Sequence, residues 1–273
     1  MKSLPKNWIR VFNEAPDFFF PDLKALLNSR ITREEINFIL KILKEEGKKS
    51  CTILDLFCGI GRISIPLAKE GFNVVGIDIS EKFINYAKNY AKKENVDYKL
   101  DLICGDARKL DSLLKNSRWQ EFDAVLWLYN SMGYTGKKGD LLILNQLNKH
   151  VNEESVMILD VMNRDWFMHI STSWGSPINH IIDAGNFLYI YELEFLLEKS
   201  IVKMHIDLYK KDNRDLIFQD EETIYIRLYS IQELSEMLSL TGWEITELYG
   251  DVNRSSFSPI SSARVIIIAH RKL

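Results

Sequence analysis

Residues 53–62 read Ile53-Leu54-Asp55-Leu56-Phe57-Cys58-Gly59-Ile60-Gly61-Arg62, and this stretch decides the fold. Its apolar first half predicts a buried strand, and the helical spacing that follows predicts a helix over Ile63–Glu70. Gly59 and Gly61 join the two elements. Glycine lets the backbone approach a ligand closely, and the helix start directs N–H groups toward it. This order of strand, glycine loop and helix indicates a ligand site at the end of the strand.

The alternation of strand and helix continues on both sides of this stretch. Capping-box spacing at residues 32–35 predicts a helix that ends at Gly47, and Ser80 is expected to cap a later helix. The strands are nearly continuous apolar runs, which indicates a parallel, doubly wound sheet that helices cover on both faces. The five expected strands are Ile53–Phe57, Val74–Ile79, Tyr98–Cys104, Asp123–Tyr129 and Ser155–Val161, with a helix from Asp140 to about Val151 before the fifth.

The pattern changes after the fifth strand. Three segments alternate apolar and polar residues without an intervening helix, which predicts a small antiparallel insertion. They are Phe187–Lys199, Ile201–Tyr209 and Leu216–Leu228. A capping box at residues 230–233 then starts a helix, and Trp243–Tyr249 and Arg264–His270 give two final strands. We therefore expect an α/β fold with a doubly wound, Rossmann-like seven-stranded sheet, an antiparallel last strand, and a small antiparallel β lid inserted after strand five.

Three units follow from this pattern. Residues 1–162 are expected to form an N-terminal flap and the α/β core, residues 163–228 the lid, and residues 229–273 the C-terminal helix and final β-hairpin of the core. The aromatic run Phe18-Phe19-Phe20 serves either as plain core or as part of a flap over the ligand. The insertion follows strand five, so it should rise over the carboxyl edge of the sheet as a lid or a dimerisation surface.

Composition and charge restrict the classes of function. The chain has 273 residues, 46% hydrophobic and 27% charged, with a net charge of −3. Its basic and acidic residues are interleaved, whereas nucleic-acid binders carry a basic face, so nucleic acid is a disfavoured partner. Three cysteines without a CxxC pair indicate neither a disulfide framework nor a metal site. The apolar runs are too short to span a membrane, and residues 1–6 lack a signal-peptide pattern, so we expect a cytoplasmic monomer or homodimer.

Three acids lie at or near the carboxyl ends of successive predicted strands. Asp55 precedes the glycine loop, where a carboxylate opposes a pyrophosphate but suits a ligand with an ammonium group. Ser64 also replaces the third glycine of a nicotinamide site. Asp78 is placed either to accept hydrogen bonds from two ribose hydroxyls or to start a helix. Asp106 is placed to accept from an adenine amino group or to cap a turn. Together they converge where open α/β sheets bind ligands.

Residues 53 to about 132 resemble the cofactor half of the class I S-adenosylmethionine (SAM)-dependent methyltransferases. The resemblance rests on the motifs DLFCGIGR, GIDIS, GDAR and FDAVLWLYNSMGY, in that order. The two final strands are similar to the hairpin that separates this fold from nicotinamide-binding relatives. Further motifs extend the resemblance over most of the chain, to a bacterial and archaeal group of small-molecule methyltransferases. The turn at residues 152–155 departs from the Pro/Gly-rich turn common there.

The resemblance implies SAM as the cofactor and S-adenosylhomocysteine as its product. Related enzymes hold the cofactor carboxylate with an arginine before the first helix. Arg30 stands at that place, either in this role or as an exposed residue at a helix start, and Arg62 is a second candidate. The residues expected to bind SAM are Arg30, Asp55, Gly59, Gly61, Asp78, Ile79, Asp106, Ala107 and Leu128, and the candidates for the acceptor site are Tyr129, Asn130, Tyr134 and Asn163.

The expected activity is methyl transfer from SAM to a nitrogen or oxygen of a small molecule. The candidate residues form no recognisable catalytic set, so the catalytic residues stay open, and Cys58 is interpreted as a small neutral filler of the loop. One alternative is a methyltransferase that acts on RNA or protein, although the Asn/Asp-Pro-Pro-aromatic motif of base-amino methyltransferases is replaced here by NSMGY. The other is a noncatalytic SAM-binding regulatory protein.

Overall fold

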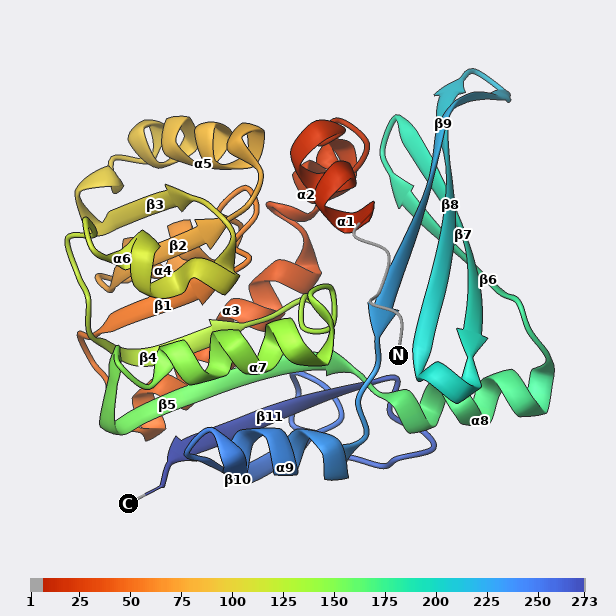
Figure 1. Ribbon diagram of the computed structural model, residues 1–273. Coiled ribbons are helices and arrows are strands. Elements are labelled where there is room, and N and C mark those ends of the chain that lie inside the picture. Colours follow the sequence, from red (N-terminus) through yellow and green to blue (C-terminus); the bar gives the residue numbers. More distant parts are fainter. Residues whose placement is uncertain (1–6, 273) are drawn as a thin grey trace.

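The computed structural model describes residues 7–272, and its core is the expected seven-stranded sheet (Figure 1). The strand order is β10-β11-β5-β4-β1-β2-β3. Strands β1 to β5 run parallel to one another, whereas β11 runs antiparallel to both β5 and β10, which confirms the antiparallel last strand. The strands are β1 (Thr52–Leu56), β2 (Asn73–Asp78), β3 (Leu100–Cys104), β4 (Phe122–Trp127), β5 (Val151–Met162), β10 (Trp243–Tyr249) and β11 (Arg264–Arg271).

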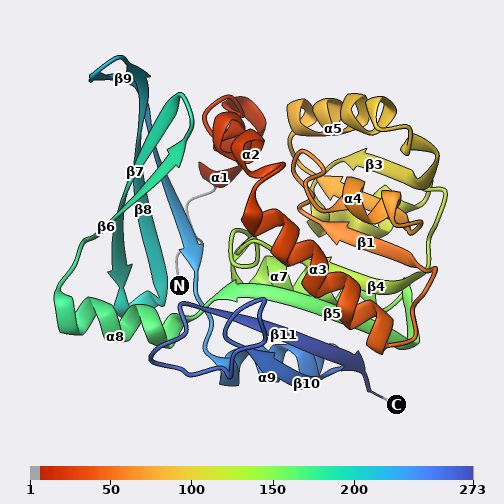
Figure 2. The ribbon, with the colours of Figure 1, turned by 180° about the vertical axis from the view of Figure 1, so that it is seen from behind.

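Helices cover both faces of this sheet because successive strand residues point to opposite sides. Ile53 packs into an apolar cluster with one helix layer, and the next residue, Leu54, packs into a second cluster with the other layer. Figure 1 shows the layer with α7 and α9, and Figure 2 shows the layer with α3 and α4. One layer contains α3 (Arg30–Glu45), α4 (Ser64–Lys69) and α5 (Glu81–Lys93), and the other contains α6 (Leu110–Leu114), α7 (Gly136–Leu147) and α9 (Ile231–Leu240).

The insertion after β5 is a four-stranded antiparallel sheet, called here the lid sheet. It consists of β6 (Ile178–Ala184), β7 (Phe187–Leu196), β8 (Ile201–Asp212) and β9 (Asp215–Arg227), and α8 (Arg164–Trp174) leads into it. The sequence did not predict α8 or β6. β6 is an edge strand and mostly exposed, so it lacks the apolar alternation by which the other three lid strands were recognised.

The N-terminal segment lies between the core and the lid sheet (Figures 1 and 2). We call residues 7–27 the N-terminal cover. It contains α1 (Asn7–Ile9), a π-helical turn η1 (Arg10–Glu14) and α2 (Phe20–Leu26). Its side chains Trp8 and Phe18 are buried in one apolar cluster with Ile60 of the glycine loop and Tyr189 of β7. The first six residues of the predicted flap lie outside the described residues.

Several helix boundaries differ from those expected. Helix α3 begins at Arg30, because the Ser29 side chain, not that of Thr32, accepts the capping hydrogen bond, from Thr32 N at 3.1 Å. Helix α7 begins at Gly136 and not at Asp140, which is buried inside it, and β5 begins at Val151. The predicted capping box at Ser230 is confirmed. Of the helices in residues 7–272, none has the length and apolar character needed to cross a membrane.

Candidate functional site

The glycine loop and the acid that ends β2 are joined by hydrogen bonds. Asp78 is buried, and its two carboxylate oxygens accept from Gly59 N and from Ser80 N, each at 2.9 Å. Asp55 is also buried and accepts from the Ser64 hydroxyl at 2.5 Å. Ser64, the residue that replaces the third glycine of a nicotinamide site, is therefore a partner of Asp55. The loop, β1 and β2 thus form one hydrogen-bonded unit at the carboxyl edge of the sheet.

Burial sets the protonation of these two carboxyl groups. It raises the pKa of Asp55 to about 6, against the opposing effects of the Ser64 hydrogen bond and the Arg62 charge. It likewise raises the pKa of Asp78 to about 6, although backbone N–H groups of Ser80, Gly59 and Ile79 favour the charged form. Both groups are mainly ionised at pH 7. Each is then a buried anion placed to accept hydrogen bonds or to face a cation.

Asp106, after β3, is already paired. Its carboxylate caps the short helix η3 (Ala107–Lys109) and accepts from the Arg108 guanidinium through Nε at 2.9 Å and Nη2 at 2.5 Å. Burial favours the neutral acid, but the hydrogen bonds and charge of Arg108 outweigh it and hold the pKa of Asp106 below its usual range. Arg108 lies 5.4 Å from the Trp8 ring of the N-terminal cover. An adenine amino group would share this carboxylate with Arg108.

The other residues expected to bind SAM lie in different surroundings. Ile79 packs against the apolar cluster that contains the N-terminal cover and the lid sheet, whereas Ala107 is buried in the α6–α7–α9 layer. Leu128 lines a small cavity that also borders Glu35 and Asp160. Ile79 is therefore at the carboxyl edge near the cover, and Leu128 faces the α3 side of the sheet.

Of the two candidate arginines, Arg62 is the buried one. Arg30 is exposed at the start of α3, and its Nε donates to Glu34 at 2.6 Å. Arg62 donates to Glu35 and, at 2.9 Å, to the Thr32 hydroxyl, and its guanidinium lies 4.9 Å from the centre of the Tyr129 ring. The Arg62 charge is therefore matched by an acid of α3 and also faces the loop that follows β4.

A buried acid under that loop fixes its backbone. Asp160 of β5 accepts from Arg264 Nε at 2.8 Å and Nη2 at 2.6 Å, and Arg264 also reaches Glu35. The same Asp160 carboxylate accepts from Tyr129 N at 3.1 Å, and its carbonyl accepts from Asn130 N at 3.2 Å. Tyr129 and Asn130 both have a φ of 56°, a conformation that L residues rarely adopt. Strain of this kind persists only where neighbouring contacts hold it, and it is frequent at functional sites.

The four candidates for the acceptor site have different polar environments. The Oδ1 atom of Asn130 is buried and accepts no hydrogen bond from the described residues. Tyr134 is half-buried, and its ring contacts Phe12 of the N-terminal cover edge-on at 5.4 Å. Asn163 differs, because its Nδ2 donates to two loop carbonyls, at 2.8 and 2.7 Å, and its Oδ1 caps α8. The Asn163 amide thus holds the start of α8, the helix that leads into the lid sheet. Tyr129, Asn130 and Tyr134 stay candidates for contact with the methyl acceptor.

The N-terminal cover touches the loops that follow β1, β3 and β4 and the helix that follows β2. Leu23 lies over the loop after β1, where a Cβ at Gly59 would meet its Cδ1 at 4.0 Å. Phe20 contacts Phe83 and Tyr86 of the helix after β2. The contacts of Trp8 with Arg108 and of Phe12 with Tyr134 reach the loops after β3 and β4. The cover therefore closes the carboxyl edge on the side that faces the lid sheet.

The lid sheet is joined to this cover and to the core. Tyr189 of β7 is fully buried and donates its hydroxyl hydrogen to Phe18 O at 2.5 Å. At the other end of the lid, Arg227 N donates to Gly133 O at 3.2 Å, and its guanidinium pairs with Glu233 of α9 at 2.5 Å. The carboxyl edge is thus enclosed by two segments far apart in the sequence.

This fold is shared with known methyl-transferring proteins. A family model described as a methyltransferase domain matches residues 47–222. The chain belongs to this methyltransferase family. The protein YqeM of Bacillus subtilis, named as a methyltransferase, is 26% identical over 211 residues, which span 77% of this chain and 78% of that protein.

Solved structures show the same fold. A SAM-dependent methyltransferase from Clostridium acetobutylicum has a TM-score of 0.74 at 18% identity, covering 95% of this chain and 98% of that one. The SAM-bound amino pentose methyltransferase CalS10 of Micromonospora echinaspora has a TM-score of 0.65 at 13% identity, covering 96% and 98%. The enzyme is therefore a class I SAM-dependent methyltransferase, as its motifs indicated.

The residues at the carboxyl edge fit SAM. Gly61 sits so close to α4 and α5 that a Cβ there would lie 2.9 Å from Ile65 Cδ1 and 3.3 Å from Ala87 Cβ, so only glycine lets the loop pack this tightly against the two helices. Asp78 accepts one backbone bond on each oxygen, which leaves further lone pairs for ribose hydroxyls. Cys58, in contrast, is buried against Gly76, and burial raises the pKa of its thiol well above the usual range, which agrees with a neutral filler.

Three polar residues at this edge were not found from the sequence. Asp22 of the cover and Glu35 of α3 are both buried acids, and Arg108 occupies the carboxylate of Asp106. Arg108 and Asp106 are two residues apart, so their pairing could have been anticipated. Asp22 gave a weaker signal: it is an acid that directly follows an aromatic run, Phe18-Phe19-Phe20-Pro21.

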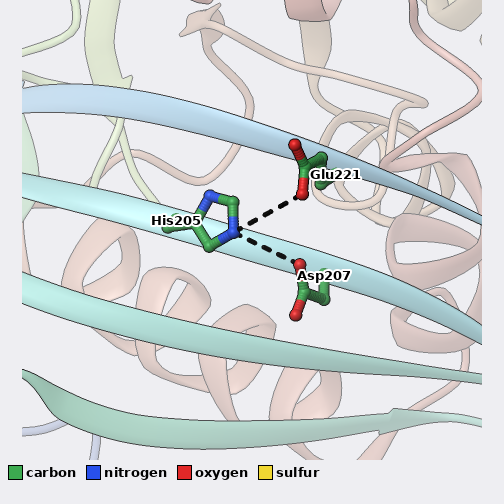
Figure 3. Close-up of side chains that lie close together, drawn as sticks. All are labelled: His205, Asp207 and Glu221. Atoms are coloured by element: carbon green, nitrogen blue, oxygen red, sulfur yellow. Dashed lines mark ion pairs between the residues drawn. The ribbon is translucent and has the colours of Figure 1, made fainter. Parts of the chain in front are cut away.

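A second polar cluster lies on the lid sheet (Figure 3). His205 Nε2 is 3.3 Å from Asp207 Oδ1 and 3.8 Å from Glu221 Oε2, and His205 Nδ1 pairs with the Thr223 hydroxyl at 3.1 Å. The alternate residues of β8 are buried, so this group occupies the opposite, more exposed face of the strand. Cross-strand polar pairs of this kind contribute about 0.2–1 kcal/mol to strand pairing. The cluster thus supports the pairing of β8 with β9.

The raised pKa values predict a pH dependence of cofactor binding. Below about pH 6, Asp55 and Asp78 take up protons, so they lose the charge that we expect to face the cofactor. We expect the Kd for SAM, measured by calorimetry, to rise about tenfold between pH 7 and pH 5. Stability changes in the opposite direction. The folded state holds protons that the unfolded chain has released, so the cofactor-free protein gains stability as pH falls from 6 toward 4. A Kd for SAM that is the same at pH 5 as at pH 7 would contradict the assignment of Asp55 and Asp78 to cofactor binding.

Proposed function

We propose that this methyltransferase transfers a methyl group to nitrogen or oxygen of a small molecule. The observation that carries the proposal is the enclosure of the carboxyl edge by the N-terminal cover on one side and the lid sheet on the other. A folded protein or a polynucleotide would require both segments to withdraw, whereas a small molecule needs only the space of a few side chains. The relative CalS10 is named as an amino pentose methyltransferase, and an amino pentose is an acceptor of this size class.

We propose the following division of roles. The glycine loop with Asp55 and Asp78 binds SAM, Ile79 and Asp106 contact its nucleoside half, and Tyr129 to Tyr134 line the acceptor. SAM supplies an activated methyl group on a sulfonium, so the protein's contribution is to hold the acceptor atom in line with it. Asn130 Oδ1, a buried acceptor of hydrogen bonds, would be satisfied by an N–H or O–H of the substrate. Residues 163–228 then act as the specificity element.

A methyl-transfer assay tests this proposal. The purified protein is incubated with methyl-labelled SAM and three acceptor pools: small amines and alcohols, total RNA, and total protein. We expect label in the small-molecule pool. Label in RNA or protein alone would overturn the small-molecule proposal and favour the macromolecular alternative. SAM binding without label in any pool would favour the regulatory alternative.

Asp78→Ala is expected to weaken SAM binding about tenfold to a hundredfold. The variant removes a charged acceptor of hydrogen bonds, each of which contributes about 1.5–3 kcal/mol. Calorimetric titration with SAM measures the change. Asp97→Ala is the matched control, because this exposed acid lies in η2 (Asp97–Lys99) at the amino end of β3, away from the site. Equal affinities of the Asp78 variant and the control would show that Asp78 does not bind the ribose.

A further inference from the structure

We propose that Asp22 is the acceptor-binding acid of this methyltransferase and that the acceptor it selects is an amine. The inference rests on the small-molecule function proposed above and adds to it the substrate class and the residue that recognises it. Asp22 lies in α2, in the N-terminal cover, and belongs to neither the SAM motifs nor the loop after β4.

Asp22 is a buried residue whose carboxylate accepts no hydrogen bond from the described residues. Its residue is only 6% exposed, yet no donor within residues 7–272 reaches its carboxylate oxygens. The nearby cation is Arg62, whose Nη1 already donates to Glu35 and Thr32. Burial raises the pKa of Asp22 to about 6, so the group is mainly ionised at pH 7. A buried charge of this kind is unfavourable unless a partner compensates it.

Three tyrosine side chains, from two segments of the chain, lie near this carboxylate. Burial raises the pKa of Tyr129, of Tyr189 and of Tyr191, and the charge of Asp22 adds to this rise, so all three phenol groups lie within its electrostatic reach. Tyr189 and Tyr191 lie on the lid sheet, with ring centres 6.4 Å apart, and Tyr129 follows β4. We call Asp22 and these three residues the acid–tyrosine cluster.

The cluster adjoins the cofactor loop. Leu23, the residue after Asp22, covers Gly59, and Arg62, which contacts the Tyr129 ring, ends the loop sequence. A group bound between Asp22 and Tyr129 is therefore close to the site proposed for SAM. The lid sheet and the N-terminal cover both contribute to the cluster, which explains why the enzyme would need both to select its acceptor.

An acid close to tyrosine side chains is a chemical match for an ammonium group. The carboxylate pairs with the positive charge, and the faces of tyrosine rings attract cations, which is how proteins recognise methylated ammonium ligands. A neutral alcohol would leave the buried charge of Asp22 without a counter-ion. The cluster therefore favours nitrogen over oxygen as the atom that is methylated.

Asp22 would also accept a proton from the amine before methyl transfer. The acceptor enters as R–NH3+, pairs with the carboxylate and gives it one proton, which leaves a neutral R–NH2. The nitrogen lone pair then forms the N–C bond while the C–S bond of the methyl donor breaks and its electron pair stays on sulfur. The product is R–NH2+–CH3, and the proton on Asp22 passes to water when the product leaves.

The first test compares wild type with Asp22→Asn, using paired amines and alcohols of the same skeleton: benzylamine and benzyl alcohol, tyramine and tyrosol, glucosamine and glucose. We expect wild type to methylate an amine in preference to its paired alcohol. Asp22→Asn should lower kcat/KM for that amine at least tenfold and leave the Kd for SAM within twofold. Asp17→Asn, in an exposed acid of the same cover, is the control and should match wild type.

The second test needs no turnover. Binding of benzyltrimethylammonium, a cation that cannot accept a methyl group, is measured by calorimetry on protein saturated with S-adenosylhomocysteine. We expect wild type to bind it at least tenfold more tightly than Asp22→Asn does. The variant should fold, because it removes an unpaired buried charge, and its Tm should be no lower than that of wild type at pH 8.

The outcomes separate the two proposals. Methylation of alcohols alone, full amine activity in Asp22→Asn, or equal or undetectable binding of the cation in wild type and variant would overturn the role of Asp22. The small-molecule function would stand in the first two cases. Methyl transfer to RNA or protein alone would overturn the small-molecule function itself, and the role of Asp22 with it.

Discussion

Arg264→Met is expected to destabilise the fold by about 3–5 kcal/mol, the effect of breaking a buried ion pair by removing one partner. Arg264 holds both oxygens of Asp160, at 2.8 and 2.6 Å, and reaches Glu35 at 3.5 Å. Asp160 is 1% exposed, so without Arg264 its charge has no comparable partner. Urea unfolding at pH 8 measures the loss.

The pH dependence of this variant follows from the same contact. Burial already raises the pKa of Asp160, and Arg264 opposes that rise. Removing Arg264 therefore raises the pKa of Asp160 further, so the variant should be least stable at high pH and recover as pH falls and the carboxyl is protonated. The double variant Arg264→Met, Asp160→Asn is the control and should be more stable than Arg264→Met alone. A loss below about 1 kcal/mol would mean that the pair is well solvated, as surface pairs are.

The activity of Arg264→Met should also fall, because Asp160 holds the backbone of the acceptor loop. Its carboxylate binds Tyr129 N, and its carbonyl binds Asn130 N, where both residues adopt positive φ. Weakening this support lets the turn relax toward an ordinary conformation. We expect a larger change in methyl transfer than in SAM affinity, since the glycine loop is held by other bonds.

Gly133→Ala is the second substitution with a large expected effect, about 2–5 kcal/mol of lost stability. Gly133 has a φ of 106°, and a Cβ there would overlap the Arg227 carbonyl oxygen. The positive φ costs an L residue roughly 1–2 kcal/mol, and the overlap adds the strain of an overpacked site, about 1–3 kcal/mol. Thermal unfolding should show a fall in Tm of about 2–4 °C for each kcal/mol.

Gly71→Ala separates these two contributions. Gly71 has nearly the same φ, 98°, but a Cβ there meets no atom within 4 Å. This control should therefore lose only the conformational part. The clash at residue 133 also pushes β9 from the loop after β4, so Gly133→Ala alone should impair methyl transfer. Equal Tm values for the two variants would show that the Arg227 carbonyl can move aside without cost.

The sequence predicted those parts of the fold whose residues carry a local pattern. Parallel strands are buried on both faces, so β1, β2 and β4 stand out as apolar runs, and the Ser80 and Ser230 caps mark their helices. The exposed edge strand β6 has no such pattern and was missed. The start of α7 was misplaced because Asp140, interpreted as a helix start, instead accepts hydrogen bonds from Thr135 and Tyr229 inside the core.

The same distinction between local patterns and distant contacts applies to the candidate site. Asp55 and Asp78 could be predicted as site residues because they lie on neighbouring strands. The contacts that close the site join distant residues: Tyr189 reaches Phe18 across 171 positions, and Arg264 reaches Glu35 across 229. Periodicity and local spacing carry no signal for such pairs, so the environment of Asp22 became visible only in the assembled fold.

The contact between Leu23 and the glycine loop has a consequence for the rate of turnover. Leu23 of α2 lies over Gly59, and the Phe18 carbonyl just before this helix accepts a hydrogen bond from the lid, so we expect α2 to shift when spent donor is exchanged for fresh. Such opening motions take microseconds to milliseconds and limit kcat in many enzymes. We therefore expect side chains of α2 outside the site, such as Phe20 on Phe83, to help set how long the product stays bound.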